Sequence, residues 1–137
     1  DAETGSEIEI RFHPGVDFEI QDELVMLEGN GGKMALIPIS GEELKVQSGE
    51  HASQFVNATT PFSWIDYFDA ELKSKENKTI VATLILPVDN AAEARQIEGT
   101  GELDLESSGN VTVSFSRKGE EYTFEFENRK GVLVLKN

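Results

Sequence analysis

A regular alternation of apolar and charged residues near the start of the chain constrains its fold more than any other feature. Residues 7–12 read Glu-Ile-Glu-Ile-Arg-Phe. Successive side chains of a β-strand point to opposite faces, so a strand here would gather the apolar side chains on one face and the charged ones on the other. A helix, with its period of 3.6 residues, would mix the two sets. The segment therefore predicts a strand that is buried on one face.

The same two-residue period continues beyond this first segment. Residues 16–20 alternate in the same way, and residues 24–27 form an apolar run that stops at the glycine-rich stretch 28–32. Glycine adopts positive φ without steric strain, so this stretch predicts a hairpin turn into a strand over residues 34–39. Pro38 has no N–H to donate to a ladder, which favours a sheet edge or a bulge for this residue.

The middle of the chain predicts further strands. A polar turn is expected at residues 48–51, and the aromatic segment at residues 61–68 has no helical period. Residues 79–86 are almost wholly apolar or β-branched, which favours a central strand covered on both faces. Pro87 would end that strand.

The last third of the chain gives the clearest strand pattern. Alternating residues 111–115 and 122–126 flank a polar turn, and Gly131 introduces a final apolar strand. About ten or more short strands, with at most one short helix near residues 90–95, predict an all-β fold. Because no connection is long enough for crossover helices, the expected architecture is an antiparallel β-sandwich.

Length and composition limit the organisation and the partners of the chain. Its 137 residues suffice for one core, and we expect a single β-sandwich domain over residues 1–137, as part of a larger protein. The absence of Cys excludes disulfides and thiolate metal sites. Twenty-six acidic and 12 basic residues give a net charge of -14, which repels phosphate and sulfate polymers. We therefore expect no nucleic acid partner, and no membrane partner, since no stretch reaches the ~18 apolar residues of a span.

Histidines and carboxylates, the usual acid and base groups, form no recognisable site. His13 is expected at the end of a strand and His51 in a turn, with no metal-ligand spacing between them. Acidic residues are so abundant that some pairs must fall at catalytic distances by density alone, and their alternation favours solvated strand faces. We therefore predict no catalytic residue, no metal site and no cofactor in this chain.

Two aromatic residues are the candidates for binding. Trp64 and Tyr67 lie in the aromatic segment, where flat rings at a sandwich edge can stack on sugar rings. The alternative is ordinary core packing, which the apolar neighbours Phe62, Ile65 and Phe68 favour for Trp64. The sequence therefore favours a buried Trp64 and keeps carbohydrate binding by Trp64 and Tyr67 as the second interpretation.

Three tripeptides fit the pattern of N-glycosylation acceptors, beginning at Asn57, Asn77 and Asn110. Such acceptors are modified only in proteins that leave the cytoplasm. Together they favour a periplasmic or extracellular location.

Four stretches, taken in order, carry a family resemblance. They are residues 9–16 (Glu-Ile-Arg-Phe-His-Pro-Gly-Val), 32–37 (Gly-Lys-Met-Ala-Leu-Ile), 63–67 (Ser-Trp-Ile-Asp-Tyr) and 79–87 (Thr-Ile-Val-Ala-Thr-Leu-Ile-Leu-Pro). This part of the chain, residues 7–89, resembles the C-terminal β region of heparinase II/III-like polysaccharide lyases. In that family an arginine, aromatic, histidine strand precedes a Trp-containing segment and a strand that ends in Pro.

The resemblance implies an accessory role. In that family a helical toroid and an upstream part of the β region supply the Tyr and His that abstract a proton next to a uronate carboxylate, and neither part is found in this sequence. The chain would then be a non-catalytic sandwich that packs on the toroid of a carbohydrate-active parent protein, and polysaccharide would be a partner of the parent. His13 matches the strand histidine of the family in position, but no catalytic residue carries over. The acidic composition departs from what a surface facing heparin or alginate needs.

A second hypothesis stays open beside this one. The acidic strands and the glycosylation acceptors also suit a free-standing extracytoplasmic module or surface protein that binds carbohydrate or protein.

Overall fold

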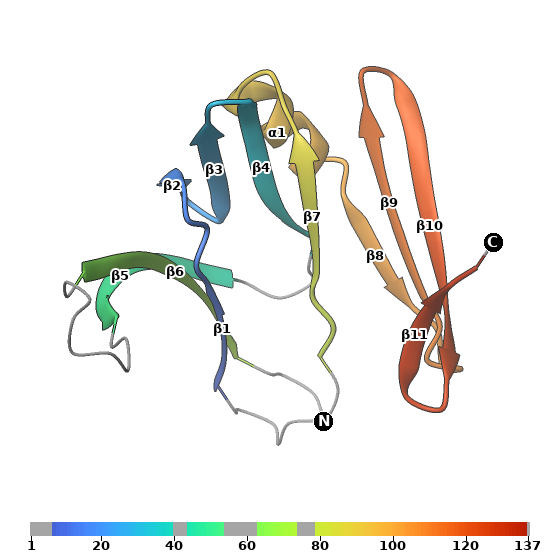
Figure 1. The fold of residues 1–137 in the computed structure, drawn as a ribbon. Helices are drawn as coiled ribbons and strands as arrows, with labels where there is room; N and C mark the ends of the chain where they lie inside the picture. Colours follow the sequence, from blue (N-terminus) through green and yellow to red (C-terminus); the bar gives the residue numbers. More distant parts are fainter. Residues whose placement is uncertain (1–6, 40–43, 54–62, 74–78, 137) are drawn as a thin grey trace.

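The computed structural model describes residues 7–39, 44–53, 63–73 and 79–136 (Figure 1). Over these residues it contains eleven strands and one short helix, so the predicted all-β class is confirmed. The elements are β1 (Glu7–Phe12), β2 (Asp17–Gln21), β3 (Leu24–Gly29), β4 (Gly32–Ile39), β5 (Leu44–Ser53), β6 (Ser63–Lys73), β7 (Ala82–Pro87), α1 (Ala91–Glu98), β8 (Glu102–Leu105), β9 (Val111–Arg117), β10 (Glu120–Arg129) and β11 (Val132–Leu135).

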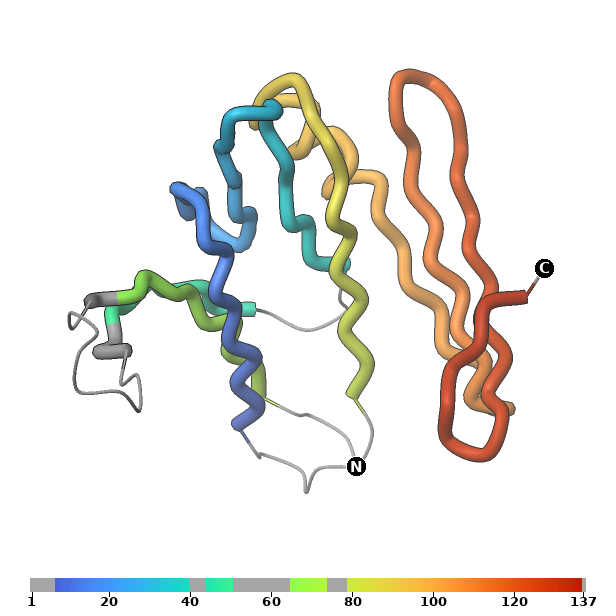
Figure 2. The backbone as a smooth tube through the Cα atoms, in the orientation of Figure 1, coloured from blue at the N-terminus to red at the C-terminus, as the bar shows by residue number. Residues whose placement is uncertain are grey.

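The strands form three antiparallel sheets. Sheet A has the order β1-β6-β5, sheet B the order β2-β3-β4-β7, and sheet C the order β11-β10-β9-β8. Sheet B lies in the middle, with β5 and β6 crossing below it and sheet C standing beside β7 (Figures 1 and 2). One face of sheet B packs against α1 and sheet C, and the other face packs against sheet A. The arrangement is a sandwich-like all-β fold.

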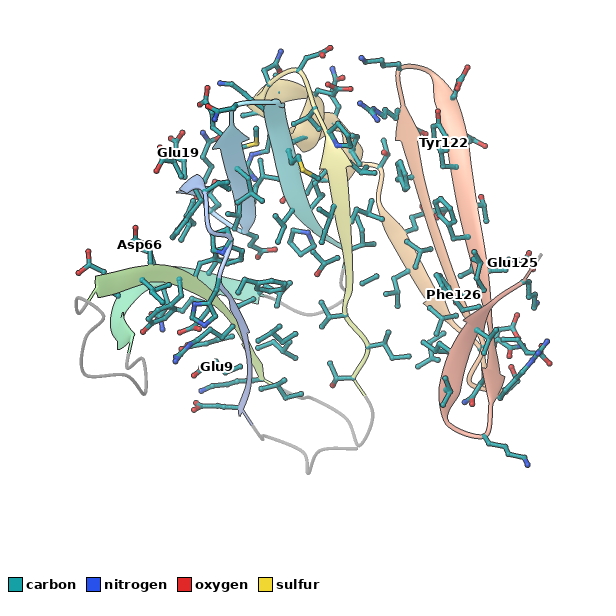
Figure 3. All side chains as sticks on the ribbon, in the orientation of Figure 1. Glu9, Glu19, Asp66, Tyr122, Glu125 and Phe126 are labelled. Carbon is teal, nitrogen blue, oxygen red and sulfur yellow. The ribbon has the colours of Figure 1, made fainter. Side chains whose placement is uncertain are left out.

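The polar faces of the strands point to solvent, as the alternation predicts. Glu9 in β1, Glu19 in β2 and Asp66 in β6 are all exposed (Figure 3). Asp69 is the exception, because it lies in β6 and is only 3% exposed. A carboxylate buried to this extent needs a partner of opposite charge.

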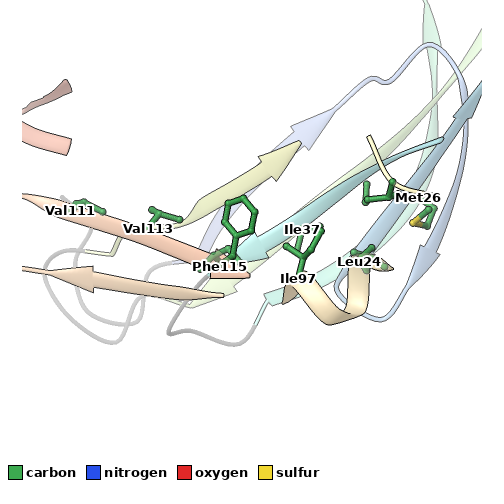
Figure 4. Packing of buried hydrophobic residues seen from close by; sticks show 11 residues of the cluster. Leu24, Met26, Ile37, Ile97, Val111, Val113 and Phe115 are labelled. Atoms are coloured by element: carbon green, nitrogen blue, oxygen red, sulfur yellow. The ribbon is translucent and has the colours of Figure 1, made fainter. Parts of the chain in front are cut away.

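The larger core lies between sheet B, α1 and sheet C. Alternation in β3 sends Leu24 to this core and the neighbouring Val25 to the opposite face of the sheet. Figure 4 shows the contributions of sheet B, α1 and sheet C in one row. The labelled members are Leu24, Met26, Ile37, Ile97, Val111, Val113 and Phe115.

The smaller core joins the opposite face of sheet B to sheet A. Its centre is Phe68 of β6, which is 2% exposed and stacks on Phe12 of β1 with ring centroids 4.9 Å apart. Phe18 of β2 meets the same ring at 5.4 Å. These three rings attach sheet A to sheet B.

Helix α1 begins after the N-cap residue Asn90. The Asn90 side chain accepts a hydrogen bond from the Glu93 N–H at 3.0 Å, and the Glu93 carboxylate accepts one from the Asp89 N–H at 2.6 Å. The expected helix near residues 90–95 is thus confirmed, and it continues to Glu98 because Ala94 and Ile97 are fully buried in the larger core. Among the residues that the structure describes, α1 is the sole helix, and its eight residues fall short of a membrane span.

The predicted turn at residues 48–51 is wrong. These residues lie inside β5, where Ser48 pairs with Phe68 and His51 pairs with Ile65. Gly49 signals close packing here instead of a turn, because a Cβ at this position would lie 2.5 Å from Cζ of Tyr67 on the neighbouring strand.

The prediction that residues 79–86 form a central strand is also wrong. Strand β7 pairs with β4 and forms one edge of sheet B. The Ile85 side chain is 53% exposed, so its face of β7 is open in the described part of the chain. Pro38 lies in β4 opposite Thr83, past the last β3 residue that pairs with β4, so its missing N–H breaks no ladder bond there.

Candidate functional site

An ion pair between an exposed arginine and a buried aspartate lies at the centre of the polar face of sheet A. Arg11 of β1 pairs in register with Asp69 of β6. Its Nε donates to Oδ1 of Asp69 at 2.7 Å and its Nη2 donates to Oδ2 at 3.1 Å. This two-point geometry is the strongest that a guanidinium and a carboxylate can adopt. It satisfies both oxygens of a carboxylate that would otherwise be buried without a partner.

Tyr67 completes this group. The guanidinium carbon of Arg11 lies 4.2 Å from the centre of the Tyr67 ring, a cation–π contact. The His13 ring meets Tyr67 edge-on, with centroids 6.0 Å apart. Gly49, opposite Tyr67 in β5, leaves the room that the tip of the ring occupies. His13 is therefore a neighbour of Tyr67, one of the two candidates for carbohydrate binding.

Two carboxylates offset the positive charge of Arg11 in this group. The hydrogen bonds to Asp69 raise the pKa of Arg11 above its ordinary value, and the nearby Glu9 carboxylate adds to the effect. Arg11 Nη2 also donates to Glu9 at 2.9 Å. A cation that already faces two carboxylates offers little attraction to an anion. The arrangement fixes Tyr67 in place and provides a polar, partly exposed surface.

The structure describes the side chain of only one of the two predicted binding residues, Tyr67. Tyr67 is partly exposed, but Arg11 covers one face of its ring, which leaves at most the other face for a sugar. Trp64 lies in β6 opposite Ala52, and His51 lies in β5. The side chains of Trp64 and His51 are outside the described part of the structure, as are Asn57 and Asn77. The predicted burial of Trp64 stays a prediction.

The third acceptor asparagine, Asn110, makes hydrogen bonds within the fold. Asn110 donates from Nδ2 to Glu106 at 3.0 Å, and its Oδ1 accepts from the Asn128 N–H at 3.0 Å. Among the described residues, no group of three or more His, Asp or Glu side chains is placed to hold a metal ion.

A second site, which the sequence did not predict, lies between β7 and sheet C. It is an apolar groove of about 480 Å³ whose lining contains no charged residue, in a chain of which 28% is charged. Figure 3 shows two of the aromatic positions of this sheet, Tyr122 and Phe126, along β10. The lining consists of residues 80–86 with Val111, Val113, Phe115, Phe124, Phe126 and Leu133.

Ion pairs close one end of this groove. Nη2 of Arg117 donates to the Pro87 carbonyl at 2.7 Å, and its Nε donates to Glu93 at 3.0 Å. Lys118 bridges Asp89 at 3.1 Å and Glu93 at 3.4 Å. Since the pKa of Glu93 is lowered, first by the Asp89 N–H and then by Arg117, this carboxylate is charged at neutral pH. The β9–β10 turn is thereby held against the end of β7 and the start of α1.

The apolar surface extends from the groove along sheet C. In β10, Phe124 is 38% exposed, and in β11 the groove-lining residue Leu133 is 42% exposed. A contiguous apolar surface of this kind, surrounded by charge, is typical of an interaction site. The alternating residues of β9 and β10 were evident in the sequence, but only the fold shows that, within the described residues, part of their apolar face is exposed.

No protein-family model, curated protein or solved structure matches this chain.

Proposed function

We propose that this chain is an accessory, non-catalytic β domain that docks through the apolar groove onto the rest of a carbohydrate-active protein. The parent protein is proposed to be a heparinase II/III-like polysaccharide lyase, and the docking partner its helical toroid. The observation that carries the proposal is the groove itself. The groove is an uncharged, apolar surface on a molecule whose net charge is -14. Such a surface is typical of one that another domain covers.

The family part of the proposal rests on the four resembling stretches. They fall on β1, β4, β6 and β7, that is, on sheets A and B. The groove lies between the last of these strands and sheet C. A partner in the groove would therefore contact both the family-like part of the chain and its C-terminal meander.

The test uses the complete product of the gene that encodes this chain. That product should degrade a uronate polymer such as heparin, alginate or chondroitin, with a rise in unsaturated-uronate absorbance, whereas the isolated chain should not. In the complete product, Phe124→Glu combined with Leu133→Glu should lower the melting temperature by several degrees, because charge enters the docking surface.

A matched control separates docking from folding. Val132→Glu changes a neighbouring residue of β11 that is 62% exposed and lies outside the groove lining, and it should leave the melting temperature nearly unchanged. The isolated chain should tolerate all three substitutions about equally. Equal losses in the isolated chain and the complete product, or a complete product with neither a toroid nor activity on a uronate polymer, would contradict the proposal.

The alternative is a free-standing extracytoplasmic module that binds carbohydrate or protein. The observation that favours it is the position of Tyr67, a partly exposed ring held by Arg11 on the polar face of sheet A. Saturable quenching of the intrinsic fluorescence by a neutral or uronic oligosaccharide, lost in Tyr67→Ala, would favour this alternative. Absence of any response would remove it.

A further inference from the structure

The register of β7 decides which of its backbone groups face the groove side. The N–H of Val88 donates to the carbonyl of Lys33 at 3.1 Å, which makes these two residues a hydrogen-bonded pair. In an antiparallel ladder such pairs alternate with non-hydrogen-bonded ones. Leu84 therefore directs its backbone groups to β4, whereas those of Thr83 and Ile85 point away from β4, toward the open edge of sheet B.

Pro87 occupies the next outward position. Its register partner is Met34, so it alternates with Val88 and would direct its N–H, had it one, to the open edge. Proline is tolerated there because it removes no bond to β4. Its outward carbonyl accepts from Arg117 at 2.7 Å. The outward groups of Thr83 and Ile85 lie between this closed end and the open end of the groove.

The side chains around this edge form an apolar site that would accept an extended segment. Residues 79–88 contain no charged residue, and the groove lining includes residues from both faces of β7. Phe124 and Phe126 of sheet C form the opposite wall. An extended segment that paired with Thr83 and Ile85 would direct alternate side chains onto these rings, because successive residues of a strand face opposite ways.

Charge distinguishes among the candidate occupants. Two copies of this chain, each with a net charge of -14, repel one another, which disfavours pairing of β7 with a second copy. A segment with basic residues on either side of an apolar centre gains from the same field.

We propose that an extended segment of the partner, apolar at alternate positions and flanked by basic residues, adds to β7 as the fifth strand of sheet B. This inference rests on the proposed docking function and specifies how the partner binds. Backbone hydrogen bonds to β7 would provide affinity, and the aromatic side chains of sheet C would select the side chains of the partner. It also explains why β7 has the apolar sequence of a central strand although it lies at the edge of sheet B.

The probe is a synthetic peptide, Lys-Lys-Val-Thr-Val-Thr-Val-Thr-Lys-Lys. Two matched peptides serve as controls, one with Glu in place of every Lys and one with Pro in place of the central Val. Binding is measured by fluorescence anisotropy, and hydrogen exchange of single amides is measured by NMR. The Lys-flanked peptide should bind at least tenfold more tightly than either control. It should also slow exchange of the Thr83 and Ile85 amides, while the already bonded Leu84 amide changes little.

Two variants separate backbone pairing from side-chain contact. Ile85→Pro removes an outward N–H and no bond to β4, so it should fold and weaken the peptide about tenfold or more. Ile85→Thr keeps the N–H and should weaken it by less than threefold. If Ile85→Pro does not fold, the exchange of the Thr83 and Ile85 amides in the unmodified chain decides alone.

The outcomes are distinct from those of the docking test. Peptide binding without protection of the Thr83 and Ile85 amides would overturn strand addition and leave docking through the groove in place. Equal binding of the three peptides would overturn it as well. Protection of these amides that grows with protein concentration in the absence of peptide would identify a second copy as the occupant and overturn the proposal.

Discussion

Nε of Arg11 lies 2.7 Å from Oδ1 of Asp69, and the two residues face each other across β1 and β6 although 58 positions separate them in the chain. Removing only Arg11 would leave the Asp69 carboxylate buried without a counter-charge. We therefore expect Arg11→Met to lower the urea midpoint clearly, and Glu9→Gln, which removes only an exposed contact of Arg11, to change it little.

The double variant Arg11→Met with Asp69→Leu provides the check on this prediction. Because it removes the buried charge together with its partner, it should be more stable than Arg11→Met alone. Additive losses from the two single substitutions would show that the pair is not coupled.

Gly49→Ala should disturb Tyr67. The added Cβ would lie 2.5 Å from both Cζ and Oη of this ring, which must then move off its position under Arg11. We expect a loss of about 1–3 kcal/mol in the free energy of unfolding. Gly31→Ala is the matched control, since a Cβ there meets no atom within 4 Å and its φ is not positive. A Gly49→Ala variant as stable as Gly31→Ala would contradict the packing of Tyr67 over Gly49.

Ile97 of α1 should be far more sensitive to truncation than Ile85 of β7. Ile97 is fully buried between sheet B and sheet C, so Ile97→Ala should lower the free energy of unfolding by about 2–5 kcal/mol. Ile85 is 53% exposed, and Ile85→Ala should lower it by less than about 1 kcal/mol. Urea denaturation followed by circular dichroism gives both values, and similar losses would mean that α1 does not lie in the core.

The stability of the chain should fall in acid partly because of Glu93. Its pKa is lowered in the folded state by the Asp89 N–H and by Arg117, so the unfolded chain takes up the proton at a higher pH. The contribution is complete above the ordinary carboxyl pKa, at about pH 5 and higher, and is lost as the pH falls through the lower folded-state value. Glu93→Gln should be less stable than the unmodified chain at pH 7, and the difference between their urea midpoints should shrink as the pH is lowered below about 5.

Local patterns in the sequence predicted most of the strands, because alternation follows from the pleat of a single strand. The hairpin between β9 and β10 belongs to this class. The pattern failed at Gly49, where glycine marks a close contact with the neighbouring strand β6, and at Ile85, where an apolar residue lies exposed on an edge strand. A turn and a close interstrand contact both use glycine, and only the register tells them apart.

The candidate sites were harder to predict than the strands. Tyr67 was a candidate because it lies in the aromatic segment, but its partners Arg11 and Asp69 depend on which strands pair. The one basic residue in the acidic face of β1 was the available signal. The groove depends on how sheet C stands relative to β7, which no local pattern records. The burial of the Trp64 side chain is still a prediction, and its fluorescence emission maximum would test it.

The open edge of β7 also bears on how this protein behaves in concentrated solution. An uncharged, apolar edge strand is a template for irreversible edge-to-edge association, which proteins counter with charge. Here the protection comes from the whole molecule, through its net charge of -14, since residues 79–88 carry none of their own. That colloidal repulsion vanishes near the isoelectric point of about 4.4, so association through β7 should increase in buffers near that pH.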